Sequence, residues 1–242
     1  MSLVPYVHLD AALATANAGD RIPLTRDEAH HLRTVLRLTA GAAVEVADGH
    51  GRHATARLGD GEVELDADVV VEPPPTVRLT VAQALPKGRK LDEVVRQVTE
   101  LGVDTLVPVA AERSVVTLGG DRARKQRARW AAVARAASEQ SRRPSRPRID
   151  ELCRPAELRG RFPDATVLVA HPGGGPLPAS LRDRGHLVVA IGPEGGWTDV
   201  EVAAMTDGQD AAVVGLGPYV LRTEHAAAAV LATCAWATGR WG

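Results

Sequence analysis

Two glycine-rich turns stand out as places where the chain could hold a ligand and carry chemistry. The first reads Gly-Pro-Glu-Gly-Gly-Trp-Thr over residues 192–198 and lies between an apolar run and a helical pattern. Glycine in such a turn lets backbone amides approach a ligand closely, and the start of the following helix favours anions. The spacing matches neither GxGxxG nor GxxxxGK followed by Ser or Thr, which excludes a dinucleotide fingerprint and a P-loop. A nucleotide-like ligand and a purely structural turn both stay open.

The second turn follows an apolar run at residues 211–214 and ends in charged residues. It passes through Leu216, Gly217 and Leu221 into Arg222 and Glu224, ahead of a final helix. Two such turns at neighbouring strand ends could form a single crevice. Glu224 complements the helix dipole there, so capping is its simplest role, whereas Arg222 opposes the dipole and hints at function.

The elements that must position these turns fall into two predicted domains. Residues 1–72 show short alternating runs between glycines, which predicts a small β domain. One helix is predicted within it over residues 26–36, where Thr25 and Glu28 have the spacing of a capping box. Three successive prolines at 73–75 cannot continue a strand ladder and stiffen the chain. We therefore expect the second domain over residues 76–242.

The second domain alternates strand and helix patterns. Strands are predicted over residues 78–85, 105–109, 166–170, 187–191 and 211–214, and helices over 91–101, 121–141, 198–205 and 224–236. This rhythm predicts an α/β fold with a mostly parallel sheet covered on both faces and with ligand sites at the strand carboxyl ends. The sequence Pro-Gly-Gly-Gly-Pro at residues 172–176 predicts a flexible loop.

The net charge of −1 conceals an uneven distribution of charge. Residues 1–75 carry twelve acidic and six basic side chains, whereas residues 122–148 carry ten basic side chains and one acidic one. Arginines dominate the basic set, and their planar forks suit bidentate contacts with phosphates. Arg142 and Arg143 therefore indicate a basic loop along a nucleic-acid backbone, with a solvated helix end as the alternative.

Several function classes lack support in the sequence. The longest uncharged apolar stretch, residues 226–238, is shorter than a bilayer span, and the N-terminus does not resemble a secretory signal, so we expect a cytoplasmic protein. The two cysteines are far apart, and the adjacent His30 and His31 would point in different directions on a helix, so no metal site is predicted. No GxSxG motif or catalytic CxxC motif supports hydrolase or redox chemistry.

Taken together, the motifs resemble the RsmE family, the 16S ribosomal RNA uridine N3-methyltransferases of the SPOUT superfamily, over most of the chain. The matching pieces are His31-Leu32-Arg33 with Val35-Leu36-Arg37, Lys87-Gly88, residues 99–103, Glu112-Arg113-Ser114, Glu139-Gln140-Ser141 with Arg143, residues 191–197, Leu216-Gly217 and residues 221–224. The chain departs from the family pattern at Gln97 and Tyr219, where basic residues are common, and at His225, where threonine is common.

The resemblance implies a PUA-like RNA-binding β-barrel over residues 1–72 and a SPOUT methyltransferase domain with a C-terminal trefoil knot over residues 76–242. It implies S-adenosylmethionine as cofactor, 16S ribosomal RNA of the small subunit as partner, a homodimer, and neither a metal nor a membrane. By matching position, the cofactor pocket would be lined by Gly192, Glu194, Gly195, Gly196, Leu216, Gly217 and Leu221.

The chemistry of such a transfer suggests roles for the charged residues. The N3 proton of uracil must leave, so a cation near the flanking carbonyl oxygens or a base is needed. Arg222 is the candidate for the cation, and Glu224 or His225 for the base. Phosphates would be anchored by Arg33, Arg37, Arg52, Arg142 and Arg143. The alternatives are a SPOUT methyltransferase for another RNA such as tRNA, a non-catalytic RNA-binding protein on the same fold, and a small-molecule enzyme.

Overall fold

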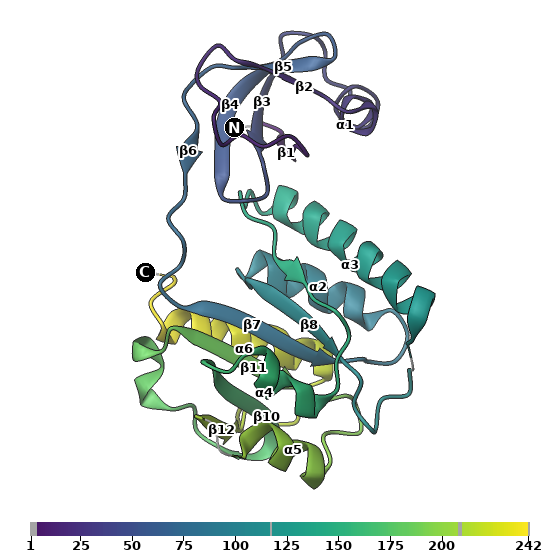
Figure 1. The fold of residues 1–242 in the computed structure, drawn as a ribbon, viewed down its shortest axis with the longest axis vertical. Helices are drawn as coiled ribbons and strands as arrows, with labels where there is room; N and C mark the ends of the chain where they lie inside the picture. Colours follow the sequence, from purple (N-terminus) through teal and green to yellow (C-terminus); the bar gives the residue numbers. More distant parts are fainter. Residues whose placement is uncertain (1–3, 117, 208–209, 242) are drawn as a thin grey trace. The chain divides into compact units, whose positions relative to one another are not determined.

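The structure, a computed structural model, describes residues 4–116, 118–207 and 210–241 and divides into two compact units (Figure 1). Unit 1 holds the chain up to Pro74 together with Arg135–Arg146. Unit 2 holds Pro75–Ala134 and the chain from Pro147 onward. Patterning alone assigns residues 135–146 to the second domain, and the structure differs because the arginines of this segment pair with groups of unit 1.

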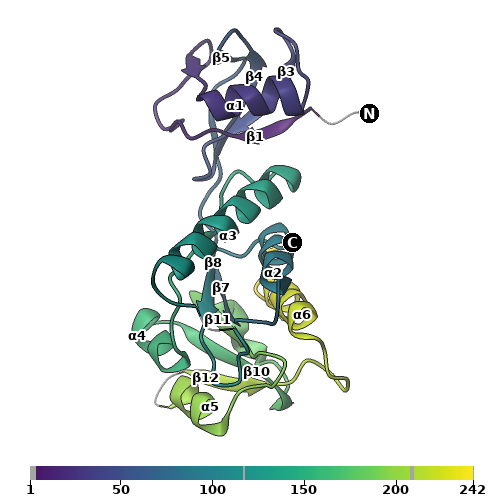
Figure 2. The same cartoon turned by 90° about the vertical axis from the view of Figure 1, so that its right-hand side faces the viewer.

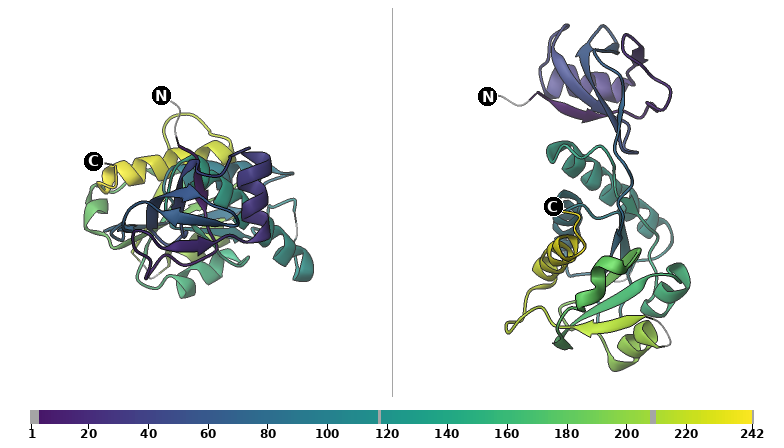
Figure 3. Two further views of the ribbon diagram at one scale, coloured as in Figure 1. Left: turned by 90° about the horizontal axis from the view of Figure 1, so that it is seen from above. Right: turned by 90° about the vertical axis from the view of Figure 1, so that its left-hand side faces the viewer.

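Unit 1 is built on one sheet of six short strands, visible in two further views in Figure 3. Its elements are β1 (Tyr6–His8), β2 (Arg21–Pro23), α1 (Arg26–His30), the π-helix η1 (His31–Val35), β3 (Ala43–Ala47), β4 (Arg52–Leu58), β5 (Glu62–Leu65) and β6 (Val70–Val71). The strand order is β1-β3-β4-β5-β2, with β6 beside β4. Among the described strand pairs of unit 1, only β1 and β3 run parallel. The predicted small β domain is confirmed.

The helix of unit 1 begins as predicted and ends differently. Thr25 Oγ1 accepts the Glu28 amide at 3.3 Å, and the Glu28 carboxylate accepts the Thr25 amide at 2.7 Å, which completes the capping box. The α-helical part nevertheless stops at His30, and residues 31–35 continue as a π-helix, which accommodates an extra residue in one turn. Leu32 from this turn is buried in the core of unit 1.

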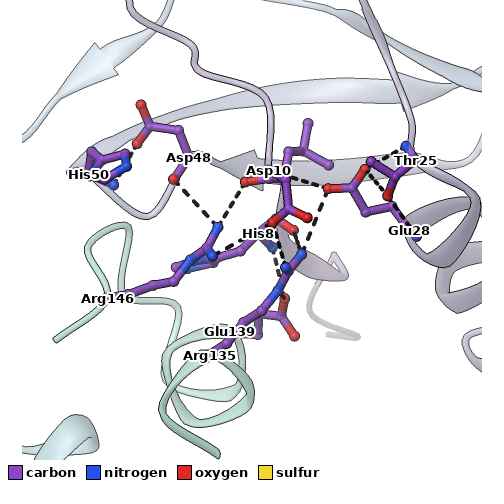
Figure 4. A network of polar contacts seen from close by, with 10 residues as sticks. His8, Asp10, Thr25, Glu28, Asp48, His50, Arg135, Glu139 and Arg146 are labelled. Carbon is purple, nitrogen blue, oxygen red and sulfur yellow. Dashed lines mark hydrogen bonds and ion pairs between the residues drawn. The ribbon is translucent and has the colours of Figure 1, made fainter. Parts of the chain in front are cut away.

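A polar network joins residues 135–146 to the strands of unit 1 (Figure 4). Arg135 donates to the Asp10 carboxylate at 2.7 Å and to the His8 carbonyl oxygen, and lies 3.3 Å from Glu139. Arg146 Nη2 donates to the Leu9 carbonyl oxygen at 2.8 Å. The acidic first domain and the basic segment therefore neutralise each other within one unit.

His8 stands at the centre of this network and is held in one neutral form. Its ring is buried, Nε2 lies 2.8 Å from the Arg143 carbonyl oxygen, and Nδ1 accepts from Arg146 Nε at 2.7 Å. Because the guanidinium can only donate, Nδ1 must be unprotonated and Nε2 carries the hydrogen. Burial, with the nearby arginine charges, lowers the pKa of His8 to about 4.

Two other residues of unit 1 adopt backbone angles that usually require glycine. Arg37 has φ of +56° and Arg142 has φ of +57°. For a residue with a side chain, this left-handed conformation costs about 1–2 kcal/mol. A compensating interaction of each side chain is therefore to be expected.

Unit 2 has the predicted α/β architecture. Its elements are β7 (Arg78–Ala84), α2 (Lys90–Glu100), β8 (Thr105–Val109), β9 (Arg148–Ile149), η2 (Pro155–Glu157), α4 (Leu158–Arg161), β10 (Thr166–Gly175), η3 (Ala179–Asp183), β11 (His186–Ile191), α5 (Asp199–Thr206), β12 (Ala211–Val214) and α6 (Thr223–Ala237). Helix α3 (Gly120–Gln140) gives its residues up to Ala134 to this unit. All the described strand pairs of unit 2 are parallel, and the strand order is β12-β10-β11-β7-β8-β9.

Helices cover both faces of this sheet, as Figure 2 shows. On one face α2 and α6 lie side by side, and Val94, Val98 and Leu231 are buried between them and the strands. On the other face α4 and α5 cover a second core that contains Phe162 and Met205. Side chains on both faces of the buried strands can therefore be apolar. No helix in the described ranges is long and apolar enough to cross a membrane.

The glycine run at residues 172–176 is not the predicted flexible loop, because β10 continues to Gly175. Gly175 pairs with Val214 of β12, and the Gly215 amide donates to the Gly175 carbonyl oxygen at 2.7 Å. A Cβ atom on Gly174 would lie 2.3 Å from the carbonyl carbon of Val214. Only glycine lets the two backbones pass this closely, so the prediction was wrong for a steric reason.

We predict that unit 1 loses stability between pH 6.5 and about 4 because of His8. Below its ordinary pKa the unfolded chain binds a proton that the folded His8 excludes, so falling pH favours unfolding. The lowered pKa corresponds to a loss of roughly 3 kcal/mol. Urea unfolding at several pH values should show this loss in the wild type and a smaller one in His8→Gln, which does not titrate. Identical pH dependence in both proteins would contradict the assignment.

Candidate active site

A cavity of about 650 Å³ opens at the carboxyl edge of the parallel sheet of unit 2. It lies among the distal part of β10, the segments that follow β11 and β12, and the first turn of α6, where an α/β sheet is expected to bind ligands. The seven residues predicted for a cofactor all line it: Gly192, Glu194, Gly195, Gly196, Leu216, Gly217 and Leu221. Arg222 lines it too, whereas Glu224 is buried just inside the start of α6.

The loop after β11 is a tight turn held by an arginine that the sequence analysis left without a role. Gly196 has φ of +70°, and its amide donates to the Pro193 carbonyl oxygen at 2.9 Å. Arg113 Nη1 donates to the carbonyl oxygens of Gly195 at 3.0 Å and of Trp197 at 3.4 Å. A Cβ atom on Gly195 would stand 3.1 Å from Arg113 Cβ, so glycine permits this close packing. The next helix begins with the predicted Thr198 cap.

The loop after β12 presents apolar side chains and one arginine to solvent. Tyr219 and Val220 are each 82% exposed, and Leu221 is 37% exposed. Arg222 is the N-cap residue of α6 and makes no capping hydrogen bond through its side chain. Its guanidinium is exposed and has no ion-pair partner within the described residues. Arg222 is therefore a cation placed at the positive end of a helix dipole, beside the cavity.

A buried chain of hydrogen bonds connects the two loops to the middle of the sheet. Gln83 Nε2, from β7, donates to Thr223 Oγ1 at 2.8 Å. Thr223 Oγ1 donates to the Gly192 carbonyl oxygen at 2.7 Å. Gln83 and Thr223 are both buried. The start of α6 is thereby fixed to the ends of two strands.

A lysine links the two glutamates of the site. Lys90 Nζ lies 3.1 Å from Glu194 Oε1 and 3.4 Å from Glu224 Oε2. Burial raises the pKa of Glu194 and of Glu224, but their own backbone amides and Lys90 outweigh it, so both pKa values are below the ordinary range. Both carboxylates are therefore ionised at neutral pH. Lys90 thus neutralises part of the charge of the two carboxylates, while Arg113 and Arg222 add positive charge to the same lining.

Sequence reasoning missed four residues of this site: Gln83, Lys90, Arg113 and Thr223. The sequence did contain a signal for Lys90, because a cation at the first position of a helix opposes the helix dipole. Arg222 shows the same feature at the start of α6. Gln83 was readable as the polar residue of an apolar strand, and Arg113 lay within a motif already noted. Within residues 4–116, 118–207 and 210–241, no group of three His, Cys, Asp or Glu side chains is placed to hold a metal.

The five arginines predicted to bind RNA all lie in unit 1, and their surroundings differ. Arg142 donates to the Val4 carbonyl oxygen at 2.8 Å and to Glu45, and its guanidinium stands 5.2 Å from the ring centroid of Tyr6. These contacts occupy the Arg142 guanidinium within unit 1, which disfavours the RNA contact predicted for it.

The other four arginines have different surroundings. Arg33 pairs with Asp60 at 2.9 Å, and Arg52 with Asp48 at 3.4 Å. Arg143 Nε donates to Ser145 Oγ at 3.1 Å. Arg37 is exposed, and no ion pair or side-chain hydrogen bond to it is found in the part of the chain that the structure describes.

Comparisons with known proteins agree on one kind of enzyme. The family of RNA methyltransferase domains matches residues 72–235, and the family of RNA methyltransferase PUA domains matches residues 24–67. Ribosomal RNA small subunit methyltransferase E of Bacillus subtilis is 32% identical over 89% of this chain and 90% of its own. The protein of that name from Mycobacterium bovis is 36% identical over 89% of this chain and 86% of its own.

A solved structure extends the likeness to the fold. The crystal structure of a ribosomal RNA small subunit methyltransferase E from Neisseria gonorrhoeae, bound to S-adenosyl methionine, superposes with a TM-score of 0.83. It is 29% identical, and the match covers 97% of this chain and 98% of that one. The likeness therefore includes both units, each with its own sheet.

We predict that Thr223→Val destabilises unit 2 and disorganises the cavity. The substitution removes the hydroxyl that accepts from the buried Gln83 amide and donates to the Gly192 carbonyl oxygen, and the loss costs about 1–3 kcal/mol. Thr223→Ser keeps the hydroxyl and should retain most of the stability. Thermal unfolding of the three proteins measures the difference. A valine variant as stable as the serine variant would show that the hydrogen-bond chain contributes little.

Proposed function

The chain belongs to the RNA methyltransferase family, and we propose on that basis that it transfers the methyl group of S-adenosylmethionine to N3 of a uridine in 16S ribosomal RNA. It is a ribosomal RNA methyltransferase that uses S-adenosylmethionine, as its relatives' names and the cofactor-bound neighbour state. The observation that carries the proposal is the single cavity onto which all seven cofactor-motif residues converge. The finer choice of N3 of uridine rests on the motif resemblance.

The cavity fits the cofactor in size and lining. Its volume of about 650 Å³ lies within the usual range for small-molecule and cofactor sites. At Gly217, with φ of +107°, a Cβ atom would meet nothing within 4 Å, so the backbone itself borders open space. Leu216 and Leu221 offer apolar surface, and Glu194 places a carboxylate at the lining that a cationic group of the cofactor can approach. S-adenosylmethionine supplies an activated methyl group when bound.

The residues of the chain would then orient the uracil and manage its N3 proton. In the transfer the bond from sulfur to methyl breaks, the bond from N3 to methyl forms, and the N3 proton leaves. We propose that Arg222 stabilises the charge that develops on the flanking carbonyl oxygens. The guanidinium is exposed and has no ion-pair partner among the described residues, which leaves it available for this role. Much of the rate would come from in-line positioning by the two loops.

For the proton, two residues at the start of α6 are the proposed acceptors. Glu224 is ionised but has a lowered pKa, because its backbone amide and Lys90 stabilise the carboxylate. His225 is exposed on the same turn and lies next to it in the chain. Glu224 is therefore a weak base whose carboxylate is held by Lys90. His225 is the alternative acceptor, and its side chain is exposed to solvent.

Unit 1 is proposed to hold the RNA. The match to the PUA domain of RNA methyltransferases supports this role. We propose that phosphates are anchored by Arg33, Arg37, Arg52 and Arg143, since Arg142 is used internally. The target base must be unpaired or turned out of its stack, because N3 lies on its Watson–Crick edge.

We further propose a homodimer, a C-terminal trefoil knot, and a cytoplasmic protein that acts on the small ribosomal subunit. Trp236 of α6 and Trp241 are 72% and 48% exposed, which supports coverage of this apolar surface by a second copy. The close crossing of Gly174 and Gly215 supports a threaded C-terminal segment. Light scattering of the purified protein gives its mass in solution directly.

Transfer of label from S-adenosylmethionine tests the function. Small-subunit particles, free 16S ribosomal RNA and tRNA are compared as substrates, followed by digestion to nucleosides. N3-methyluridine from a small-subunit substrate is the expected result. Label in tRNA alone would favour a different RNA target, and no label together with no cofactor binding would favour a non-catalytic RNA-binding protein.

We predict that Arg222→Ala lowers the turnover number about 100-fold or more and leaves cofactor affinity within a few-fold of the wild type. The loss of one charge-stabilising donor has this size in other enzymes. Calorimetry with the cofactor separates binding from catalysis. Arg222→Lys keeps the charge without the planar fork and should recover part of the rate. Near-normal turnover of the alanine variant would remove Arg222 from the mechanism.

A further inference from the structure

The two left-handed arginines of unit 1 form a natural comparison. Arg37 and Arg142 have almost the same φ, +56° and +57°. Arg142 makes several contacts in this conformation, to Glu45, to the Val4 carbonyl oxygen and to the Tyr6 ring. The internal interactions of that side chain explain why the position is not glycine.

Arg37 has no such explanation within the fold. It directly follows Leu36, the C-cap of η1, at the position where glycine is most common. The backbone on either side closes a regular helix end, because the Leu38 amide donates to the Leu32 carbonyl oxygen at 3.0 Å. Yet the side chain of Arg37 is exposed, and the described residues offer it no ion pair. An arginine at a left-handed position that favours glycine, without a stabilising contact in the described structure, indicates that the side chain has a function.

The residues before Arg37 add an exposed apolar pair. Val35 is 59% exposed and Leu36 is 37% exposed. The turn that carries them is nevertheless firmly attached, because Leu32 is buried in the core. Arg33 Nη2 also donates to the Gly59 carbonyl oxygen at 2.7 Å and to Asp60 at 2.9 Å. A rigid base therefore presents two apolar side chains and one cation that the fold itself does not use.

We propose that residues 35–37 form a contact surface for an unpaired segment of RNA. Val35 and Leu36 pack against the face of a base, and Arg37 binds the adjacent phosphate. Apolar side chains of this kind insert beside bases in other nucleic-acid complexes, and arginine adds the phosphate contact. This inference deepens the proposed function, on which it rests, by assigning the RNA contact to one turn of unit 1.

Charge favours this turn over the remainder of the unit. Residues 1–75 carry twelve acidic and six basic side chains, so most of this surface repels a polyanion. Along residues 26–37 the exposed charged side chains are mainly basic, with Arg26 and Arg37 making no ion pair in the described structure and Glu28 buried in its cap. RNA can therefore approach closely along this segment.

Binding of a 16S ribosomal RNA transcript by the full chain tests the inference, with affinity measured across a series of salt concentrations. Arg37→Gly should weaken binding about fivefold and reduce the salt slope by about one unit, because one phosphate contact is lost. Its unfolding midpoint should stay level or rise, since glycine relieves the left-handed backbone. Val35→Ser with Leu36→Ser should weaken binding about tenfold and leave the salt slope unchanged.

Arg142→Gly is the matched control, because it changes the same residue type at the same backbone angle. It should lower the unfolding midpoint and leave the RNA affinity of the folded protein within about twofold. Cofactor affinity should be unchanged in every variant. If the wild type binds RNA and transfers the methyl group, and both turn variants bind RNA as tightly as the wild type, the role of residues 35–37 is overturned. The proposed function would stand in that case.

Other outcomes are equally decisive. A change in oligomeric mass of the Val35→Ser, Leu36→Ser variant without a change in RNA affinity would assign the turn to a second copy of the chain and overturn the inference. If the wild type binds the cofactor but does not bind the transcript, the RNA contact is rejected. If it also transfers no methyl group to any RNA, the proposed function is rejected as well.

Discussion

The hydroxyl of Thr223 holds together the part of the molecule where chemistry can occur. It receives a hydrogen from Gln83 and gives its own to the carbonyl oxygen of Gly192, so one buried atom joins β7, the loop after β11 and the start of α6. Unpaired polar groups at this depth would be costly, which makes the arrangement specific. The cavity depends on it because Arg222 and Glu224 flank Thr223 in the chain. Their positions relative to the glycine loop follow from this anchor.

Electrostatics divides the molecule into charges used for folding and charges left available. In unit 1, the side chains of Arg135, Arg142 and Arg146 donate hydrogen bonds to carboxylates, carbonyl oxygens and the His8 ring. The basic run that suggests a nucleic-acid surface in the sequence is thus in large part the complement of an acidic sheet. Arg37 and Arg222 differ, because each is exposed and has no ion-pair partner in the described ranges.

Three cations share a further property, since each occupies a place that local backbone physics disfavours. Lys90 and Arg222 stand at the N-termini of α2 and α6, against the dipole, and Arg37 occupies a left-handed position that suits glycine. Lys90 is compensated by two glutamates of the cavity. Arg222 and Arg37 have no comparable partner in the part of the chain that the structure describes, which is why they carry the functional proposals.

The sequence by itself determined most of the elements and the position of the site. Periodicity placed β8 and β12 at their observed bounds, the capping boxes at Thr25 and Thr198 were readable from spacing, and the two glycine turns do meet at one cavity. These features depend on residues close together in the chain, so local propensity is sufficient to predict them.

Tertiary structure decided what depends on distant partners. Only the fold could show that Arg142 is occupied by Glu45, that residues 135–146 belong with the first sheet, and that Gly174 allows a close backbone approach to Gly215. Each of these pairs segments separated by tens of residues, and no local pattern encodes which partner a charge or a glycine will meet. The same holds for the bridge from Lys90 to Glu194 and Glu224, which exists only once three strand ends lie at one edge of a sheet.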